Sequence, residues 1–295
     1  MLDEPRYPMP HKPGRPRPQS RRVEPRELFE VSMLDGAAGV LHRRHFGDVE
    51  NQYPWSTLDP AEYPISLVER MRIGWTHNAF NEYCTAIAMG QIAQALGQVR
   101  APLDLWSLAC QFPIQEVLHV ELCARVATQL GGGAPLDYAP STLAVPLDPS
   151  LTAIQRASEL IVRVCCIGEA VSLPLLAGHM KAATHPVTKG VLTKIVQDEA
   201  LHGKLGLLYL DWIAAELDVV ERDRLARVAR DTLDSYQEIW DSLSSRVVDG
   251  MTSEGYRVEH IHALGWMDSE AYKECAADNL RRVAIEPLRR YGIDC

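Results

Sequence analysis

Two short stretches of the chain combine a glutamate with a histidine three residues later. They are Glu116 with His119 and Glu199 with His202. On a helix, positions i and i+3 lie on one face, so the carboxylate and imidazole of each pair can reach a single cation. About one such pair is expected by chance in a chain of this size, so the pairs indicate a metal site only if further ligands accompany them.

Each pair is preceded by a further glutamate, Glu82 before the first and Glu169 before the second. All six residues interrupt apolar stripes with helical spacing. An unpaired buried carboxylate costs several kcal/mol in a fold that is stable by about 5 to 15 kcal/mol. Four carboxylates and two imidazoles are the ligand set of a di-metal site inside a four-helix bundle. Coincidental buried polar residues are the competing interpretation.

The charges of this set suit two divalent cations. Four carboxylates neutralise two divalent iron ions, which permits their burial in an apolar core. Two neutral imidazoles complete the set and leave open positions where dioxygen could bind. Carboxylates can change between terminal and bridging modes, which suits redox chemistry better than a closed zinc site does. A manganese–iron or dimanganese pair would fit the same ligands.

Long stretches with a period of 3.6 residues dominate the chain, and strand signals are scarce, so the sequence predicts an all-α fold. Four helices would carry the six residues, and a connection over 132–149 is long enough to cross a whole bundle. Two further amphipathic helices would cover the bundle or form a subunit interface. The expected ranges are 65–97, 102–131, 150–183 and 186–217 for the bundle, then 221–248 and 268–290.

The expected domain organisation has four parts. Residues 1–27 are rich in proline and arginine and would form a disordered or surface-draped basic arm, either solvated or touching an acidic or phosphate-bearing partner. Residues 28–64 form an N-terminal extension, with a short helix near 26–33. The bundle spans 65–217, and 218–295 is a helical extension packed on it. His42 and His45 lie beside two arginines, which favours a surface role over metal binding.

The composition sets broad limits. The chain has 295 residues, 46% of them hydrophobic, and a formal net charge of −9. The acidic balance favours a soluble protein and argues against nucleic-acid binding. Seven cysteines without Cys-x-x-Cys spacing are typical of reduced cytoplasmic thiols. No secretion signal or membrane span is indicated, so we expect a cytoplasmic protein.

The region 65–217 resembles the ferritin-like di-iron carboxylate superfamily. The string from Asp198 to Gly203 is similar to the second motif of rubrerythrin-like proteins and of bacterial multicomponent mono-oxygenases. The resemblance implies that Asp198 hydrogen-bonds the ring of His119 and that Gln115 hydrogen-bonds the ring of His202. It also implies a ferritin-like bundle with one long crossover, and metal ligation by Glu82, Glu116, His119, Glu169, Glu199 and His202.

No well-known subfamily is matched closely. Cys123 stands where ribonucleotide reductase small subunits have a radical tyrosine. Leu173 stands where methane mono-oxygenase-type hydroxylases have a threonine, with Ser172 one position short. Ile195 replaces the additional histidine of arylamine N-oxygenases. The four-cysteine module of rubrerythrins is absent from the sequence.

These features predict a di-iron oxidase or oxygenase that uses dioxygen and an external electron donor, a protein or a small reductant, to oxidise a small organic substrate. Hydroxylation, N-oxygenation and desaturation are all open, as is a homodimer. The alternatives are iron handling without an organic substrate, as in a ferroxidase or a storage protein, and a metal-free helical interaction module.

Overall fold

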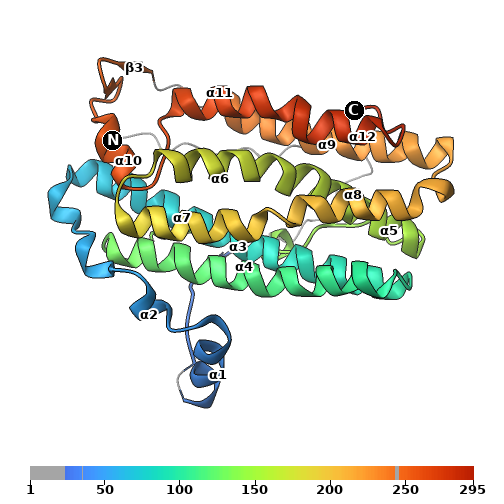
Figure 1. Cartoon of the computed structure of the whole chain (residues 1–295), viewed down its shortest axis with the longest axis horizontal. Helices are drawn as coiled ribbons and strands as arrows, with labels where there is room; N and C mark the ends of the chain where they lie inside the picture. Colours follow the sequence, from blue (N-terminus) through green and yellow to red (C-terminus); the bar gives the residue numbers. More distant parts are fainter. Residues whose placement is uncertain (1–23, 35, 243–245) are drawn as a thin grey trace.

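The structure, a computed structural model, describes residues 24–34, 36–242 and 246–295, with backbone alone for 237–242. The prediction of a mostly helical chain is confirmed. Four long helical stretches lie side by side (Figure 1). They are α3 (Ile65–Gln98), α4 (Leu103–Gln129), a third stretch made of α5 (Ala153–Leu160), the π-helix η4 (Ile161–Glu169) and α6 (Ala170–Ala182), and a fourth made of α7 (Pro186–Glu199) and α8 (His202–Ile213).

Local sequence explains where these helices begin and end. Pro102 precedes α4, and Gly131 and Gly132 follow it with φ of 114° and 105°, a conformation that favours glycine. Thr152 caps α5 through a capping box with Gln155. The helix starts and stops predicted from sequence therefore lie within a few residues of the observed ones.

Two of the four long helical stretches are less regular than expected, and the helix expected over 268–290 is also interrupted by a π-helix, Arg281–Ile285. The third stretch contains nine π-helical residues that end on Glu169. The fourth is not the single predicted helix over 186–217, because Ala200 and Leu201 form a turn between α7 and α8. The irregularities of the third and fourth stretches both fall at residues of the predicted metal site.

The connection after α4 runs the length of the helices, as a crossover must. The backbone N–H of Ala134 donates to Thr76 Oγ1 at 3.0 Å, and that of Val145 donates to Gln91 Oε1 at 2.9 Å. Thr76 and Gln91 lie in opposite halves of α3. The connection contains β2 (Asp137–Tyr138) and η3 (Pro140–Thr142), and it returns the chain to the far end for α5.

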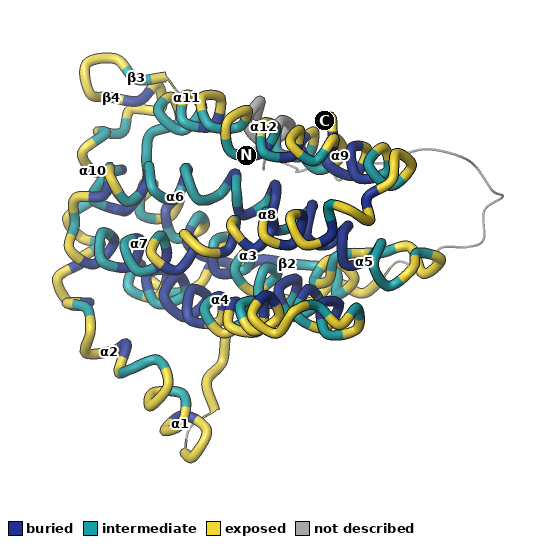
Figure 2. The backbone as a smooth tube through the Cα atoms, turned by 45° about the vertical axis from the view of Figure 1, so that its right-hand side comes forward, coloured by how far each residue is buried: buried dark blue, intermediate teal, exposed yellow. Residues whose placement is uncertain are grey.

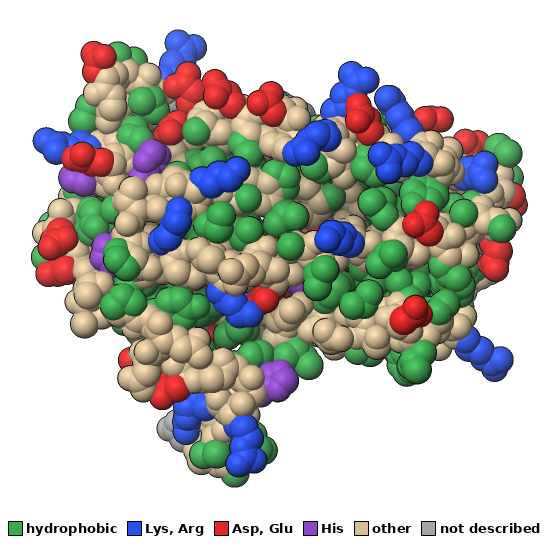
Figure 3. All heavy atoms as spheres, viewed as in Figure 1, with side chains coloured by type: hydrophobic (Ala, Val, Ile, Leu, Met, Phe, Trp, Pro, Cys, Tyr) green, Lys and Arg blue, Asp and Glu red, His purple; other side chains and the backbone are tan. Residues whose placement is uncertain are grey.

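The N-terminal extension differs from the prediction. The short helix expected near 26–33 is wrong, because β1 (Glu27–Leu28) pairs antiparallel with β2 instead. Helix α1 (Ala37–Phe46) was not predicted, and it stands out from the body (Figures 1 and 3). His42 is not a free surface residue, since its Nε2 lies 2.7 Å from Glu121 Oε2 on α4.

Positions 1–23 of the predicted arm lie outside the described residues. Helix α2 (Val49–Gln52), η1 (Trp55–Thr57) and η2 (Pro60–Glu62) lead into α3.

The C-terminal region lies along the bundle. After η5 (Ala214–Glu216), helix α9 packs on the π-helix, and α11 packs on α6. The segment expected to be a loop over 250–265 contains one strand of a hairpin and a short helix. The elements are α9 (Val219–Ser242), β3 (Val247–Val248), β4 (Met251–Thr252), α10 (Val258–Ala263), α11 (Ser269–Leu280), the π-helix η6 (Arg281–Ile285) and α12 (Glu286–Arg289).

Two hydrophobic clusters fill the interior (Figure 2). Phe112 belongs to one and Cys123 to the other, so the α4 residues between them lie where the clusters meet. The stretch Ala153–Ala182 is long and apolar enough to cross a membrane by length and composition. Half of its most apolar window is buried inside the protein, as in core helices that pass the same test, so this is weak evidence for a span.

Candidate metal centre

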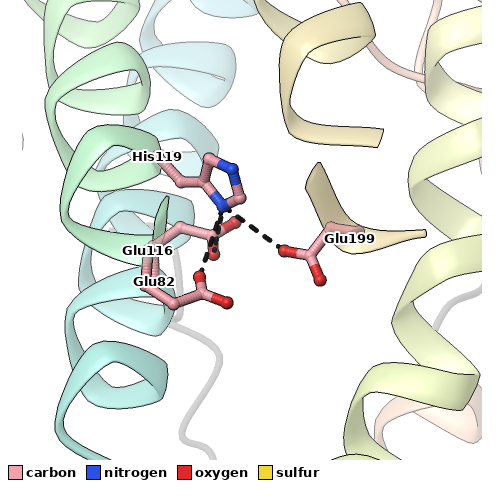
Figure 4. A group of neighbouring side chains, drawn as sticks. All are labelled: Glu82, Glu116, His119 and Glu199. Carbon is pink, nitrogen blue, oxygen red and sulfur yellow. Dashed lines mark hydrogen bonds and ion pairs between the residues drawn. The ribbon is translucent and has the colours of Figure 1, made fainter. Parts of the chain in front are cut away.

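The six residues singled out from sequence lie together in the interior. Each of the four helical stretches contributes: Glu82 comes from α3, Glu116 and His119 from α4, Glu169 from the end of the π-helix, and Glu199 and His202 from the two sides of the turn between α7 and α8. Figure 4 shows Glu82, Glu116 and His119 facing Glu199 across the centre. The ligand atoms form two groups, each with all atoms within 4.8 Å of one another: Glu82, Glu116, His119 and Glu199 in one, and Glu116, Glu169, Glu199 and His202 in the other.

The two groups share Glu116 and Glu199. One oxygen of Glu116 lies 3.3 Å from His119 Nδ1 and the other lies 2.9 Å from His202 Nδ1. Glu199 repeats the arrangement, with its two oxygens 3.3 Å and 2.9 Å from the same nitrogens. Each of these carboxylates can therefore give one oxygen to each of two cations.

Glu82 and Glu169 each belong to one group only. A Glu82 oxygen lies 3.7 Å from His119 Nδ1, and a Glu169 oxygen lies 3.8 Å from His202 Nδ1. The two imidazole centroids are 6.4 Å apart. Each half of the cluster thus offers one histidine, one carboxylate of its own and two shared carboxylates.

Three buried atoms in this cluster make no hydrogen bond: Glu116 Oε1, Glu199 Oε2 and His202 Nδ1. Each of the two oxygens lies 2.9 Å from His202 Nδ1, so distance is not what prevents a hydrogen bond. Their bonding directions do not point at one another as a hydrogen bond requires. Buried polar groups without partners are costly. A bound cation would provide a common partner for these three converging atoms. The donor set therefore fits two divalent metal ions.

The outer nitrogen of each histidine is held by a polar side chain. His119 Nε2 lies 3.2 Å from Asp198 Oδ2, and His202 Nε2 lies 3.0 Å from Gln115 Oε1. Both partners are acceptors, so each Nε2 donates to its partner, and in the neutral ring Nδ1 keeps its lone pair toward the cluster. These are the two contacts that the resemblance implied.

Lys194 is a site residue that sequence reasoning missed. Its Nζ donates to Asp198 Oδ1 at 2.7 Å. Burial raises the pKa of Asp198, but the His119 ring and the Lys194 ammonium lower it further, so it stays below its usual value. The i, i+4 spacing of Lys194 and Asp198 on a helix is the signal that could have revealed it.

The electrostatics of the protein chain alone reflect crowded acids. Burial raises the pKa of Glu82 to about 8, and burial together with the neighbouring Glu199 raises that of Glu169. Burial lowers the pKa of His202, but the negative carboxylates of the three glutamates that face the ring outweigh this effect and bring the pKa to about 12. Protons are thus drawn onto the cluster, which shows how strongly it favours positive charge.

The surroundings of the centre are apolar. The ring of Phe112 packs 4.3 Å from that of His202, centroid to centroid. Of the six side chains, Glu82 is the most accessible, with 13% of its surface exposed, against 7% or less for the others. Water is therefore largely excluded, and the small exposed part of the cluster belongs to Glu82.

Comparisons with protein-family models, with curated proteins and with solved structures found no match to this chain.

Proposed function

We propose that this chain is a ferritin-like di-metal carboxylate enzyme. Its cluster would bind two iron ions and use dioxygen to oxidise a small organic substrate, with electrons from an external donor. The observation that carries the proposal is the pair of shared glutamates, Glu116 and Glu199, each placed between His119 and His202. The crossover, which returns the chain to the opposite end before α5, supports a ferritin-like bundle. The alternative metals are a manganese–iron or dimanganese pair.

The roles of the residues follow from their positions. Glu82 and His119 would hold one metal ion, and Glu169 and His202 the other. The bound irons would supply the reduction of dioxygen and the oxidation of the substrate. Asp198 and Gln115 would keep both imidazoles in the tautomer that presents Nδ1. The apolar contact of Phe112 would keep water from the centre.

Metal content tests the proposal directly. The full chain purified from iron-replete cells is expected to hold about two metal ions, and the variants E199A and H202A far less. Glu121 is a matched control, because it is a buried glutamate on α4 that pairs with His42 and Arg125 instead of the cluster. The variant E121A should keep its metal. Fewer than about one metal per wild-type chain would contradict the proposal and favour a metal-free interaction module.

Iron stoichiometry separates the enzyme from an iron-handling protein. Anaerobic protein is loaded with ferrous iron and then exposed to oxygen. An oxygenase should take up about two irons per chain, and its oxygen consumption should depend on an added reductant and an organic substrate. Oxidation of many irons per chain without a substrate would instead show storage.

A further inference from the structure

A cavity lies away from the metal centre, where the C-terminal region covers one end of the helices. It has a volume of about 250 Å³ and lies between α3, α6, the β3–β4 hairpin, α10 and the start of α11. These elements meet at the left-hand end of the molecule in Figure 1. An engineered apolar cavity of about 150 Å³ is enough to bind benzene, so this one has room for a bicyclic molecule.

The wall of the cavity is fixed in place by the segment between α10 and α11. Trp75 Nε1 donates to Leu264 O at 3.0 Å, and the backbone N–H of Met267 donates to His179 Nδ1 at 2.9 Å. A Cβ at Gly74 would lie 2.8 Å from the Trp266 ring, and one at Gly178 would lie 2.5 Å from Met267 Sδ. The two glycines therefore create the space in which Trp266 and Met267 sit, and the cavity is formed before any ligand arrives.

His179 is a polar residue in the wall of the cavity. Its side chain is buried and lines the cavity, against the rings of Trp266 and Tyr272. Burial lowers the pKa of His179 to about 4, so the ring is neutral at physiological pH. Because Nδ1 accepts from Met267, the proton of the neutral ring is on Nε2. The ring is thus a hydrogen-bond donor without charge.

The other lining groups favour an uncharged ligand. The walls include Leu67, Met71 and Ile261, together with aromatic rings. The charged side chains at the cavity already have partners, since Arg70 and Glu254, which both line it, pair with each other. Asp268 likewise accepts from the backbone N–H groups of Glu270 and Ala271 at the start of α11. A charged ligand would lose its hydration without gaining a free partner.

The cavity is too far from the metal centre to hold a molecule that is being oxidised there. Gly74 precedes Glu82 by eight positions on α3, about 12 Å along the axis. His179 follows Glu169 by ten positions, about 15 Å away along its helix. A ligand here would occupy a site of its own, and its binding does not depend on whether the metal centre has the function proposed above.

We propose that this cavity is a binding site for a small uncharged aromatic molecule with a hydrogen-bond acceptor oxygen, held between the aromatic walls and oriented by the Nε2–H of His179. The geometry fits a molecule of one or two rings that has a ketone or an ether oxygen, either within a ring or attached to one. The site is separate from the di-metal cluster.

The test measures binding of three probes to the full chain by calorimetry or ligand-observed NMR. We expect 1-indanone to bind with a Kd below about 1 mM, and indane, which lacks the oxygen, to bind about fivefold more weakly. Benzyltrimethylammonium tests the charged alternative. Tighter binding of this cation than of 1-indanone would overturn the proposed ligand class, and no binding of 1-indanone at several times that concentration would overturn the site.

Variants locate the binding. S269W narrows the cavity from the start of α11 and M71W fills it from α3, so either should abolish binding of 1-indanone. L208W is the control, since Leu208 is 46% exposed on α8 and does not line the cavity. H179L should remove the preference for 1-indanone over indane. Thermal unfolding checks that each variant is folded. If M71W does not fold, S269W still tests the site, because Ser269 lies closer to the surface. Undiminished binding in S269W would show that the molecule binds elsewhere and would refute the proposal.

Discussion

Two glycines on α8 offer a matched test of how closely this helix must approach the π-helix. A Cβ added at Gly206 would lie 2.6 Å from Cys166 Sγ and 3.1 Å from the backbone nitrogen of the same residue. A Cβ at Gly203, about one turn earlier, would meet no atom of another segment closer than 3.7 Å. The substitutions G206A and G203A are chemically identical, so their difference isolates the contact with Cys166.

The magnitude follows from two opposing effects. Alanine is favoured over glycine in a helix by about 1 kcal/mol, and this gain is common to both variants. Overpacking a close contact costs about 1 to 3 kcal/mol. Only G206A has this cost, because its Cβ would be too close to both the sulfur and the backbone nitrogen of Cys166. We therefore expect G206A to be less stable than G203A by about 1 to 3 kcal/mol.

The assay is urea unfolding of both variants in a chelating buffer, so that metal binding does not contribute. A metal titration follows, because moving α8 from the π-helix would separate His202 from Glu169 and weaken binding in G206A alone. Equal unfolding free energies for the two variants, within about 0.5 kcal/mol, would show that the helices can move apart freely and would refute the reasoning.

Three further outcomes are expected. The variant D198A should lower metal affinity by about 10- to 100-fold, because the ring of His119 loses the acceptor that orients it. Competition with a chromophoric chelator measures the affinity, and an unchanged value would contradict this role. The folded-state pKa of His179 is about 4, below the unfolded value of 6.5, so the unfolded chain binds the extra proton. The contribution of His179 to the free energy of unfolding should be complete above pH 6.5 and should fall by about 3 kcal/mol as the pH drops to 4. Acid unfolding of H179Q should not show this loss. Glu159 is 10% exposed and lies 2.6 Å from Arg224 and 2.9 Å from Arg163, so E159A should cost about 1 to 3 kcal/mol in denaturant unfolding. A cost near zero would show that the two ion pairs together contribute nothing.

The sequence was sufficient to predict the residues that come together and the helices that carry them. Spacing alone placed Glu116 and His119 on one face, and apolar stripes placed that face inside. The contact between His119 and Asp198 was foreseen only through a resemblance, since no local pattern joins residues on two different helices. The helix predicted near 26–33 was wrong for the same reason, because Glu27 and Leu28 pair with the distant residues 137–138 as a strand.

The irregular helices were beyond reach of the sequence for a related reason. The π-helix from Ile161 to Glu169 and the turn at Ala200 and Leu201 contain no proline or glycine except Gly168, so local propensity favours a regular helix at both places. Both segments depart from that preference, as helices often do at functional sites.

The two Glu-x-x-His motifs, equivalent in sequence, are therefore not equivalent in structure. Glu116 and His119 lie within one unbroken helix, whereas the turn at 200–201 separates Glu199 from His202. Regular helical hydrogen bonds fix the relative position of the first pair, whereas the second pair is joined through a turn, with Leu201 N–H donating to Asp198 O at 3.4 Å. Because Glu116 and Glu199 both face His119 and His202, cations bound between them would tie the second pair to the first. A cation that neutralises the shared carboxylates would therefore also stabilise the α7–α8 turn.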